Sequence, residues 1–233
     1  LIAITISFKV YTVFFFAWFI FKREWKMVSY TLIFTLLINS ITFLYFGIET
    51  ALGYYAYWWT NIAQGFPMLM HKNQSFFALI WRLTVPEDNG LGFNYSILNL
   101  SMDQGKKLAY LIIFGASIYP MVKLFPKRGN NSETILQELF LFIGLIPLLS
   151  PLAWKAYFIF LLPLIFNNFY YLFIVKNQNK SVQYLFWAGM IMLIFSSEIF
   201  VGRDFSKYLE AFSIISIGAI IQVITGFIIR IKD

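Results

Sequence analysis

Polar residues that could take part in chemistry stand together in the long stretch between two groups of apolar segments. His71-Lys72-Asn73-Gln74-Ser75 precede an apolar run that includes Arg82. Amides and a guanidinium donate hydrogen bonds to oxygen atoms of a ligand or of the protein, and a charged donor strengthens such bonds. A lone histidine is more often a hydrogen-bonded structural residue than a base or ligand. We therefore place a candidate binding site in residues 49–105 and keep both interpretations of His71.

Two lysines outside this stretch carry a similar signal. Lys9 lies inside the first apolar segment, where an ammonium is costly unless it pairs, lines a wet cavity or reaches the interface. Lys9 therefore either has a functional role inside the membrane or extends to the membrane surface. Lys155, which follows Trp154, either binds phosphate or lies among lipid headgroups.

The composition places these residues in a membrane protein. Of 233 residues, 60% are hydrophobic, 21% are aromatic and only 12% are charged, which exceeds the apolar content of soluble domains. The net charge of +7 comes from basic residues near the ends of apolar segments, which indicates topology and no nucleic-acid partner. The absence of cysteine and the single histidine exclude a disulfide framework or thiolate site and give no reason to expect a metal or cofactor.

Apolar stretches of bilayer-spanning length predict an all-α polytopic fold of about seven transmembrane helices. We expect the chain to form one transmembrane domain over residues 1–233. A proline cannot continue a helical hydrogen-bond ladder, so Ser150-Pro151 should turn a tight helical hairpin. The predicted spans are 2–21, 27–47, 108–125, 135–149, 157–175, 182–201 and 211–229.

The basic residues also predict the orientation of these spans. Under the positive-inside rule, the side on which lysines and arginines are packed at the helix ends is the cytoplasmic side. Residues 49–105, 150–156 and 202–210 then face outward, and 49–105 form a long extracytoplasmic loop. The residues assigned to the cytoplasmic side are Lys22, Arg23, Lys26, Lys123, Lys127, Arg128, Lys176, Lys180, Arg230 and Lys232.

The outer loop should contain short helices at the membrane surface. Phe76, Phe77, Ile80 and Trp81 have helical spacing, and the aromatic cluster 54–59 is typical of a headgroup anchor. The chain begins Leu1-Ile2-Ala3, with neither an initiator methionine nor the pattern of a signal peptide. We interpret it as a fragment that lacks its N-terminal helices.

Several short motifs occur in an order that resembles the later half of glycosyltransferase family 87, the polyprenyl-phosphate-sugar-dependent membrane mannosyltransferases of the C-type superfamily. The resemblance covers about residues 5–165 and implies a partial C-type fold. Members of the family often have histidines just after the tryptophan, where this chain has Lys155, Ala156 and Tyr157. The motifs are Lys9-Val10-Tyr11, Phe21-Lys22-Arg23-Glu24-Trp25-Lys26, Phe46-Gly47-Ile48-Glu49, Asn73-Gln74-Ser75 with Arg82, and Leu148-Leu149-Ser150-Pro151-Leu152-Ala153-Trp154.

The resemblance implies that a hexose, by expectation mannose, moves from a polyprenyl-phosphate carrier to a glycan or glycolipid acceptor. The reaction would take place on the outer face of the cytoplasmic membrane, among membrane lipids. C-type enzymes take their catalytic carboxylate from an N-terminal outer loop, so we assign no base and expect the fragment alone to be inactive. The residues expected to bind substrate are Lys9, His71, Asn73, Gln74, Ser75, Arg82, Trp154, Lys155 and Tyr157.

Two other classes of protein fit the membrane pattern. A transporter or flippase should contain internally repeated helices, and the chain has no convincing internal repeat. A non-catalytic subunit of an envelope-glycan assembly would have no reason to gather polar residues such as Asn73, Arg82 and Lys155 on one side. Both remain alternatives at the level of sequence.

Overall fold

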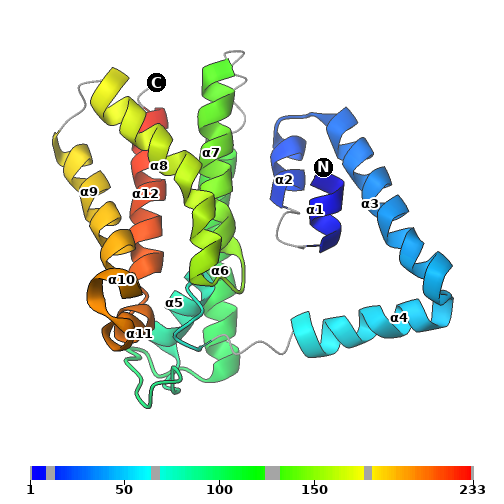
Figure 1. The fold of residues 1–233 in the computed structure, drawn as a ribbon, viewed down its shortest axis with the longest axis horizontal. Helices are drawn as coiled ribbons and strands as arrows, with labels where there is room; N and C mark the ends of the chain where they lie inside the picture. Colours follow the sequence, from blue (N-terminus) through cyan, green and yellow to red (C-terminus); the bar gives the residue numbers. More distant parts are fainter. Residues whose placement is uncertain (1, 9–13, 64–68, 124–131, 176–179, 232–233) are drawn as a thin grey trace. The chain divides into compact units, whose positions relative to one another are not determined.

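The computed structural model of the chain describes residues 2–8, 14–63, 69–123, 132–175 and 180–231. All regular secondary structure within these ranges is helical, as the composition predicts. The contacts group the chain into two compact units, Leu1–Pro67 and Met68–Asp233, where the sequence led us to expect one domain. We call them unit 1 and unit 2 and describe each by itself (Figure 1).

Unit 1 is built around one long helix, α3, against which α1 and α2 pack. The basic turn between α2 and α3 is tight, because Arg23 has a left-handed φ of 57°. The backbone N–H of Glu24 donates to the Phe19 carbonyl at 2.9 Å. A carbonyl in the last turn of α2 thereby has a hydrogen-bond partner. The helices of unit 1 are α1 (Ile2–Phe8), α2 (Phe14–Phe21), α3 (Trp25–Phe46) and α4 (Ile48–Tyr57), and α4 continues as a π-helical turn, Trp58–Ala63.

The apolar side chains of unit 1 are largely uncovered by protein. α3 buries Thr31 and exposes Leu36, Leu44 and Tyr45. Tyr57 and Trp59, two of the predicted headgroup anchors, are also exposed. Such all-round apolar exposure is what a lipid-facing helix requires.

Unit 2 contains the remaining helices, and α12 lies at its centre. α12 packs against α7, α8 and α9. The unit comprises α5 (Phe76–Thr84), α6 (Met102–Lys123), α7 (Ser132–Leu149), a 3₁₀ helix (Lys155–Leu161), α8 (Leu162–Phe169), a π-helical turn (Tyr170–Val175), α9 (Lys180–Phe195), α10 (Glu198–Val201), α11 (Arg203–Ala211) and α12 (Ile214–Ile231).

Small residues let α9 and α12 approach closely. A Cβ atom on Gly218 would lie 3.0 Å from the Gly189 carbonyl oxygen, and a Cβ on Gly189 would lie 2.8 Å from Gln222 Nε2. Glycines at such crossings favour helix association in membranes, where packing replaces the hydrophobic driving force. The apolar core beside this crossing comprises Leu141, Leu148, Leu161, Leu164, Ala219 and Val223.

Two described helical stretches are long and apolar enough to cross a membrane: α3 and the continuous stretch Lys155–Val175. α11 and α12 together would make a third, bent by 61° at its break, and α9 is a shorter apolar helix. The first predicted span, 2–21, coincides with α1 and α2 on either side of residues that the structure does not describe. The chain is therefore a helical membrane protein.

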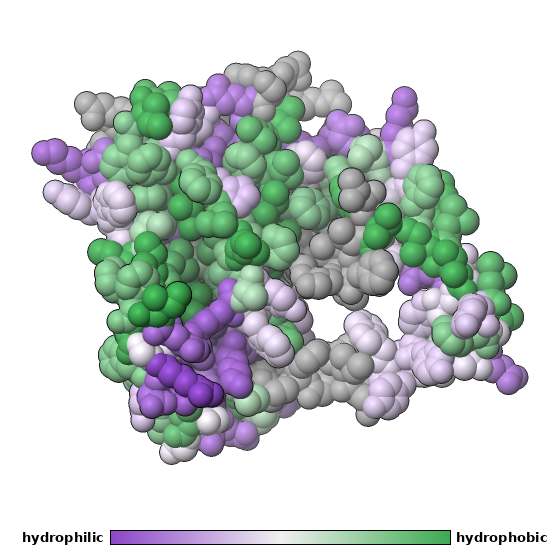
Figure 2. Space-filling view, in the orientation of Figure 1, coloured by the Kyte–Doolittle hydropathy of each residue, from purple (hydrophilic) through white to green (hydrophobic). Residues whose placement is uncertain are grey.

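The predicted hairpin turn at Ser150-Pro151 is confirmed. α7 ends at Leu149 and the next helix begins at Lys155, and α7 packs against both that 3₁₀ helix and α8. This turn lies at the same end of unit 2 as α5, α10 and α11 (Figure 1). Figure 2 shows a mostly hydrophobic face over α8 and α9, with hydrophilic residues gathered below it, toward the end of unit 2 that holds α11.

Candidate functional site

The helix predicted from the spacing of Phe76, Phe77, Ile80 and Trp81 is confirmed as α5, Phe76–Thr84, and a serine starts it. Ser75 is the N-cap, and its Oγ accepts a hydrogen bond from the Ala78 N–H at 3.0 Å, which satisfies a free donor of the first turn. We expected this helix to lie against the membrane surface. Instead the structure surrounds α5 with protein, because Phe77, Ile80 and Trp81 form an apolar cluster together with Leu69, Val85 and Ala109.

The loop before α5 is joined to the hairpin turn by four hydrogen bonds. Asn73 Nδ2 donates to the Pro151 carbonyl at 3.0 Å, and Asn73 Oδ1 accepts from the Ala153 N–H at 3.0 Å. The backbone N–H of Gln74 donates to the Ala153 carbonyl at 2.7 Å. Ser75 Oγ adds a bond of 3.2 Å to the Pro151 carbonyl. The two polar segments predicted to share one face of the bilayer are therefore in contact.

Arg82 holds the same loop in place by donating hydrogen bonds to its backbone carbonyls. Its Nη1 donates to the carbonyls of Met70 and Asn73, both at 2.9 Å, and Nη2 donates to Ser213 Oγ at 2.5 Å. The side chain is buried, and burial lowers the pKa of Arg82 from its ordinary value, while Tyr95 and Glu210 act in the opposite direction. The planar fork of a guanidinium suits such multiple carbonyl contacts. Arg82 thus binds the chain itself in this structure.

Gln74 connects the loop to α11 and α12. Its Nε2 donates to the carbonyls of His71 at 2.5 Å and Glu210 at 2.7 Å. Ser216 Oγ donates to the Gln74 carbonyl at 2.7 Å. Gln74 is fully buried, so these bonds replace the hydrogen bonds that its amide would make to water.

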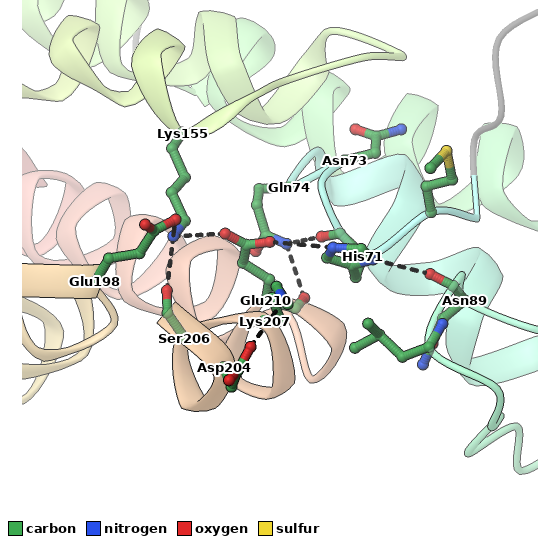
Figure 3. Close-up of polar contacts among 12 residues, drawn as sticks. His71, Asn73, Gln74, Asn89, Lys155, Glu198, Asp204, Ser206, Lys207 and Glu210 are labelled. Atoms are coloured by element: carbon green, nitrogen blue, oxygen red, sulfur yellow. Dashed lines mark hydrogen bonds and ion pairs between the residues drawn. The ribbon is translucent and has the colours of Figure 1, made fainter. Parts of the chain in front are cut away.

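The charged part of the site is centred on Lys155 and Glu210. Lys155 Nζ lies 2.5 Å from Glu210 Oε1 and donates to Ser206 Oγ at 2.7 Å. Glu198 Oε1 is a more distant carboxylate partner at 3.9 Å. On the other side of the same carboxylate, His71 Nε2 lies 3.7 Å from Glu210 Oε2. Figure 3 shows the resulting row from Glu198 through Lys155 and Glu210 to His71.

Exposure divides this row into an inner and an outer part. The side chains of His71 and Glu210 are 8% and 9% exposed, whereas those of Lys155 and Glu198 are 33% and 57% exposed. Lys155 is therefore the part of the row that an anion from outside can reach. A lysine held in this way can neutralise the charge of a phosphate as a compact cation.

The structure brings most of the predicted binding residues together. His71, Asn73, Gln74, Ser75 and Arg82 form the buried wall, and Lys155 forms the accessible side. Trp154 is exposed and precedes the 3₁₀ helix, and the Tyr157 N–H donates to its carbonyl at 2.8 Å. Lys9 lies outside the described residues. Within the described part of the chain, no group of three or more His, Cys, Asp or Glu side chains can hold a metal ion.

Sequence reasoning missed Glu198, Ser206 and Glu210 as members of the site. Ser206 and Glu210 are four residues apart on α11, so they share one helix face, and both are buried. A polar pair at this spacing beside the apolar segment 211–229 was the available signal. Their burial against Lys155 depends on the bend between α11 and α12, which local sequence does not reveal.

A model of glycosyltransferase family 87 matches residues 1–119. The chain belongs to glycosyltransferase family 87. The matched segment includes all of unit 1 and, in unit 2, the wall residues His71, Asn73, Gln74, Ser75 and Arg82. As a member of family 87 the chain is a membrane glycosyltransferase. Lys155, Glu198 and Glu210 lie beyond the match. Comparison with curated proteins and with solved structures finds no match.

Proposed function

We propose that this family 87 protein transfers a hexose, mannose in the first instance, from a polyprenyl-phosphate carrier to a hydroxyl of a glycan or glycolipid acceptor. The reaction would take place on the outer face of the cytoplasmic membrane. The proposal includes the seven spans expected from the sequence, with the end of unit 2 that holds Lys155 facing outward. Family membership supports the transfer of a sugar. The lipid-linked donor, the identity of the sugar and the side of the membrane are parts of our proposal.

The observation that carries the proposal is the position of Lys155. Its side chain is one-third exposed, and its ammonium is held by Glu210 and Ser206 at the end of unit 2 where three predicted outer loops meet. A lipid-linked donor presents its phosphate at the bilayer surface while its isoprenoid tail stays in the apolar layer. A cation at the end of an apolar bundle matches that division between charge and hydrocarbon.

The chemistry needs two events at the anomeric carbon of the donor. The bond from this carbon to the phosphate oxygen breaks, and a bond to the acceptor oxygen forms. The acceptor's hydroxyl proton passes to a base, and the carrier leaves as polyprenyl phosphate. Charge that builds on the departing phosphate is stabilised by Lys155, which is the electrostatic contribution we assign to this chain. We assign no base, because both oxygens of Glu210 face Lys155 or His71.

The polar wall has a supporting role in this proposal. Asn73, Gln74 and Ser75 hold the loops that carry His71 and Lys155, through bonds to backbone groups. Because those bonds cross between segments far apart in the sequence, they fix the place of the lysine. Trp154 and Tyr157 flank it and are proposed to cover the sugar or carrier.

The test is Lys155→Met in the full-length protein, assayed in membranes with a short isoprenyl-phosphate mannose donor. We expect transfer to fall about tenfold or more, a loss of roughly 1.4 kcal/mol in transition-state stabilisation. Lys107→Met is the matched control, because Lys107 is exposed and pairs with its exposed helical neighbour Asp103. Unchanged transfer in Lys155→Met, or a wild-type protein that uses only nucleotide-linked sugars, would contradict the proposal.

A further inference from the structure

Lys155 has two carboxylate partners, which differ in their distance from its ammonium and in their exposure. Glu210 lies 2.5 Å from the ammonium on the inner side and is 9% exposed. Glu198 lies 3.9 Å away on the outer side and is 57% exposed. Two charges at close range in a buried setting interact far more strongly than an exposed pair at longer range, which water and salt screen. The two carboxylates are therefore held to the lysine with unequal strength.

The elements that carry the two carboxylates also differ in how firmly they are packed. Glu210 belongs to α11, where Ser206 and Ala211 are fully buried, and its carbonyl accepts the Gln74 amide. Glu198 begins α10, a four-residue helix whose Ile199 and Phe200 side chains are exposed. Segments with few buried contacts rearrange at low free-energy cost. α10 is thus the element of this cluster that can move.

An anion that approaches Lys155 from outside meets Glu198 first. A phosphate and this carboxylate would compete for the same face of the ammonium, because Glu210 and Ser206 already occupy the inner face. Like charges brought together at this distance repel, and the exposed partner is the one that can withdraw into water. The buried carboxylate cannot withdraw without leaving a charge unpaired.

We propose that Glu210 is a positioning residue that holds Lys155 in place, and that Glu198 is the exchangeable carboxylate that the donor phosphate displaces. This inference rests on the proposed function, since it assigns the phosphate of the lipid-linked donor to Lys155. Its consequence is that two carboxylates on one lysine act in opposite directions. Glu198 weakens donor binding, whereas Glu210 supports the reaction.

The first measurement needs no sugar transfer. An amine-acylating reagent modifies the unprotonated, accessible lysine, and mass spectrometry reports the rate for each lysine separately. A short-chain isoprenyl monophosphate is the probe, and it should slow acylation of Lys155. Lys207, which pairs with Asp204 at 2.8 Å on the exposed side of α11, is the internal reference. In Glu198→Gln, half-protection of Lys155 should occur at about 2- to 5-fold lower probe concentration, and high salt should reduce this difference.

Glu210→Gln should behave differently in the same experiment. The amide retains the shape of the carboxylate but not its charge, so acylation of Lys155 without probe should rise about 3- to 10-fold, more than in Glu198→Gln. Half-protection of Lys155 in Glu210→Gln should need a probe concentration at least as high as in the wild-type protein. A thermal unfolding curve checks that the variant folds. Should it not fold, the exposed Glu198→Gln variant still decides the proposal, since this change touches no buried group.

The second measurement is donor kinetics in the full-length protein. Glu198→Gln should lower the donor KM by about 2- to 5-fold. Glu210→Gln should lower kcat by about tenfold or more, because a cation displaced by an ångström no longer meets the leaving oxygen. A purely structural role for Glu210 would lower the amount of folded protein and leave kcat per folded molecule as in the wild type, which would overturn its assignment as a positioning residue.

The outcomes separate this inference from the proposed function. If the probe protects Lys155 with the expected order of variants but no isoprenyl-phosphate sugar is consumed, the charge exchange stands and the glycosyl-transfer proposal fails. If transfer depends on Lys155 but Glu198→Gln leaves both KM and half-protection unchanged, or raises them, the exchange is overturned while the proposed function stands.

Discussion

Asn73 and Ala153, which are eighty positions apart in the sequence, are joined by a hydrogen bond of 3.0 Å from the Ala153 N–H to Asn73 Oδ1. The same oxygen accepts the Ser75 N–H at 3.1 Å, and the amide nitrogen donates to Pro151. One buried side chain thus closes its own loop and binds the hairpin turn. Together with the Gln74 and Ser75 bonds to the same turn, this contact fixes Lys155 relative to the loop that carries His71.

Asn73→Ala should therefore destabilise unit 2. The change removes one donor and two acceptor contacts and leaves the buried Ala153 N–H and Pro151 carbonyl with fewer partners, at a cost of about 1–3 kcal/mol. Reversible unfolding in mixed detergent micelles measures the loss. Asn94→Ala is the control, because Asn94 is exposed and its contact with Ser96 is long, at 3.5 Å. Equal stability of the two variants would show that the bond does not hold the turn.

Much of this site could be predicted from local signals. The spacing of Phe76, Phe77, Ile80 and Trp81 predicted α5, and Pro151 predicted the hairpin turn. The charge pattern also placed residues 71–82, 150–156 and 202–210 on one side, and the structure joins these three segments at one end of unit 2. These predictions succeeded because helix periodicity, proline geometry and loop charge are local properties of the chain.

The remaining features depend on tertiary contacts. Glu210 looks like a solvated charge on a short polar helix until the bend of 61° after α11 turns it toward Lys155. The amides of Asn73 and Gln74 look like free donors in sequence, but they bind backbone carbonyls in the structure. Sequence shows which side chains can donate a hydrogen bond, and only the fold decides which acceptor each one finds.

Gly189→Ala should loosen the crossing of α9 and α12. The added methyl would lie 3.0 Å from Ile221 Cγ2 and 3.1 Å from the Gly218 carbonyl, so the helices must separate, at a cost of about 1–3 kcal/mol. Gly115→Ala is the matched control, because nothing lies within 4 Å of its added methyl and alanine favours a helix more than glycine. Thermal unfolding should show a lower midpoint for Gly189→Ala alone. A shift of the same size in both variants would contradict this packing.

Single cysteines test the proposed sidedness without background, since the chain has none. Glu87 is exposed beyond the end of α5, and Lys180 is exposed at the start of α9, toward the other end of unit 2. On intact cells, an impermeant thiol reagent should label Glu87→Cys and leave Lys180→Cys unlabelled until the membrane is opened. The reverse pattern would place Lys155 on the cytoplasmic side and remove the basis for an outward-facing reaction.

Gln74 and Lys155 should be energetically coupled, because both bind Glu210. The Gln74 amide fixes the Glu210 carbonyl at 2.7 Å, and Lys155 binds its carboxylate at 2.5 Å. Loss of either partner lets Glu210 shift. The second substitution therefore lowers the free energy of unfolding by less than it would in the wild-type protein. In a double-mutant cycle of Gln74→Ala and Lys155→Met, we expect the free energies of unfolding to depart from additivity by about 0.5–3 kcal/mol.

The control for this cycle pairs Gln74→Ala with Lys107→Met, which removes an equal charge from an exposed position in α6. Residues without shared partners add to within about 0.5 kcal/mol. Coupling in the first cycle and additivity in the second would show that Glu210 transmits the effect of the buried wall to the accessible cation. Additivity in both cycles would mean that the buried Gln74 amide has no part in placing Lys155.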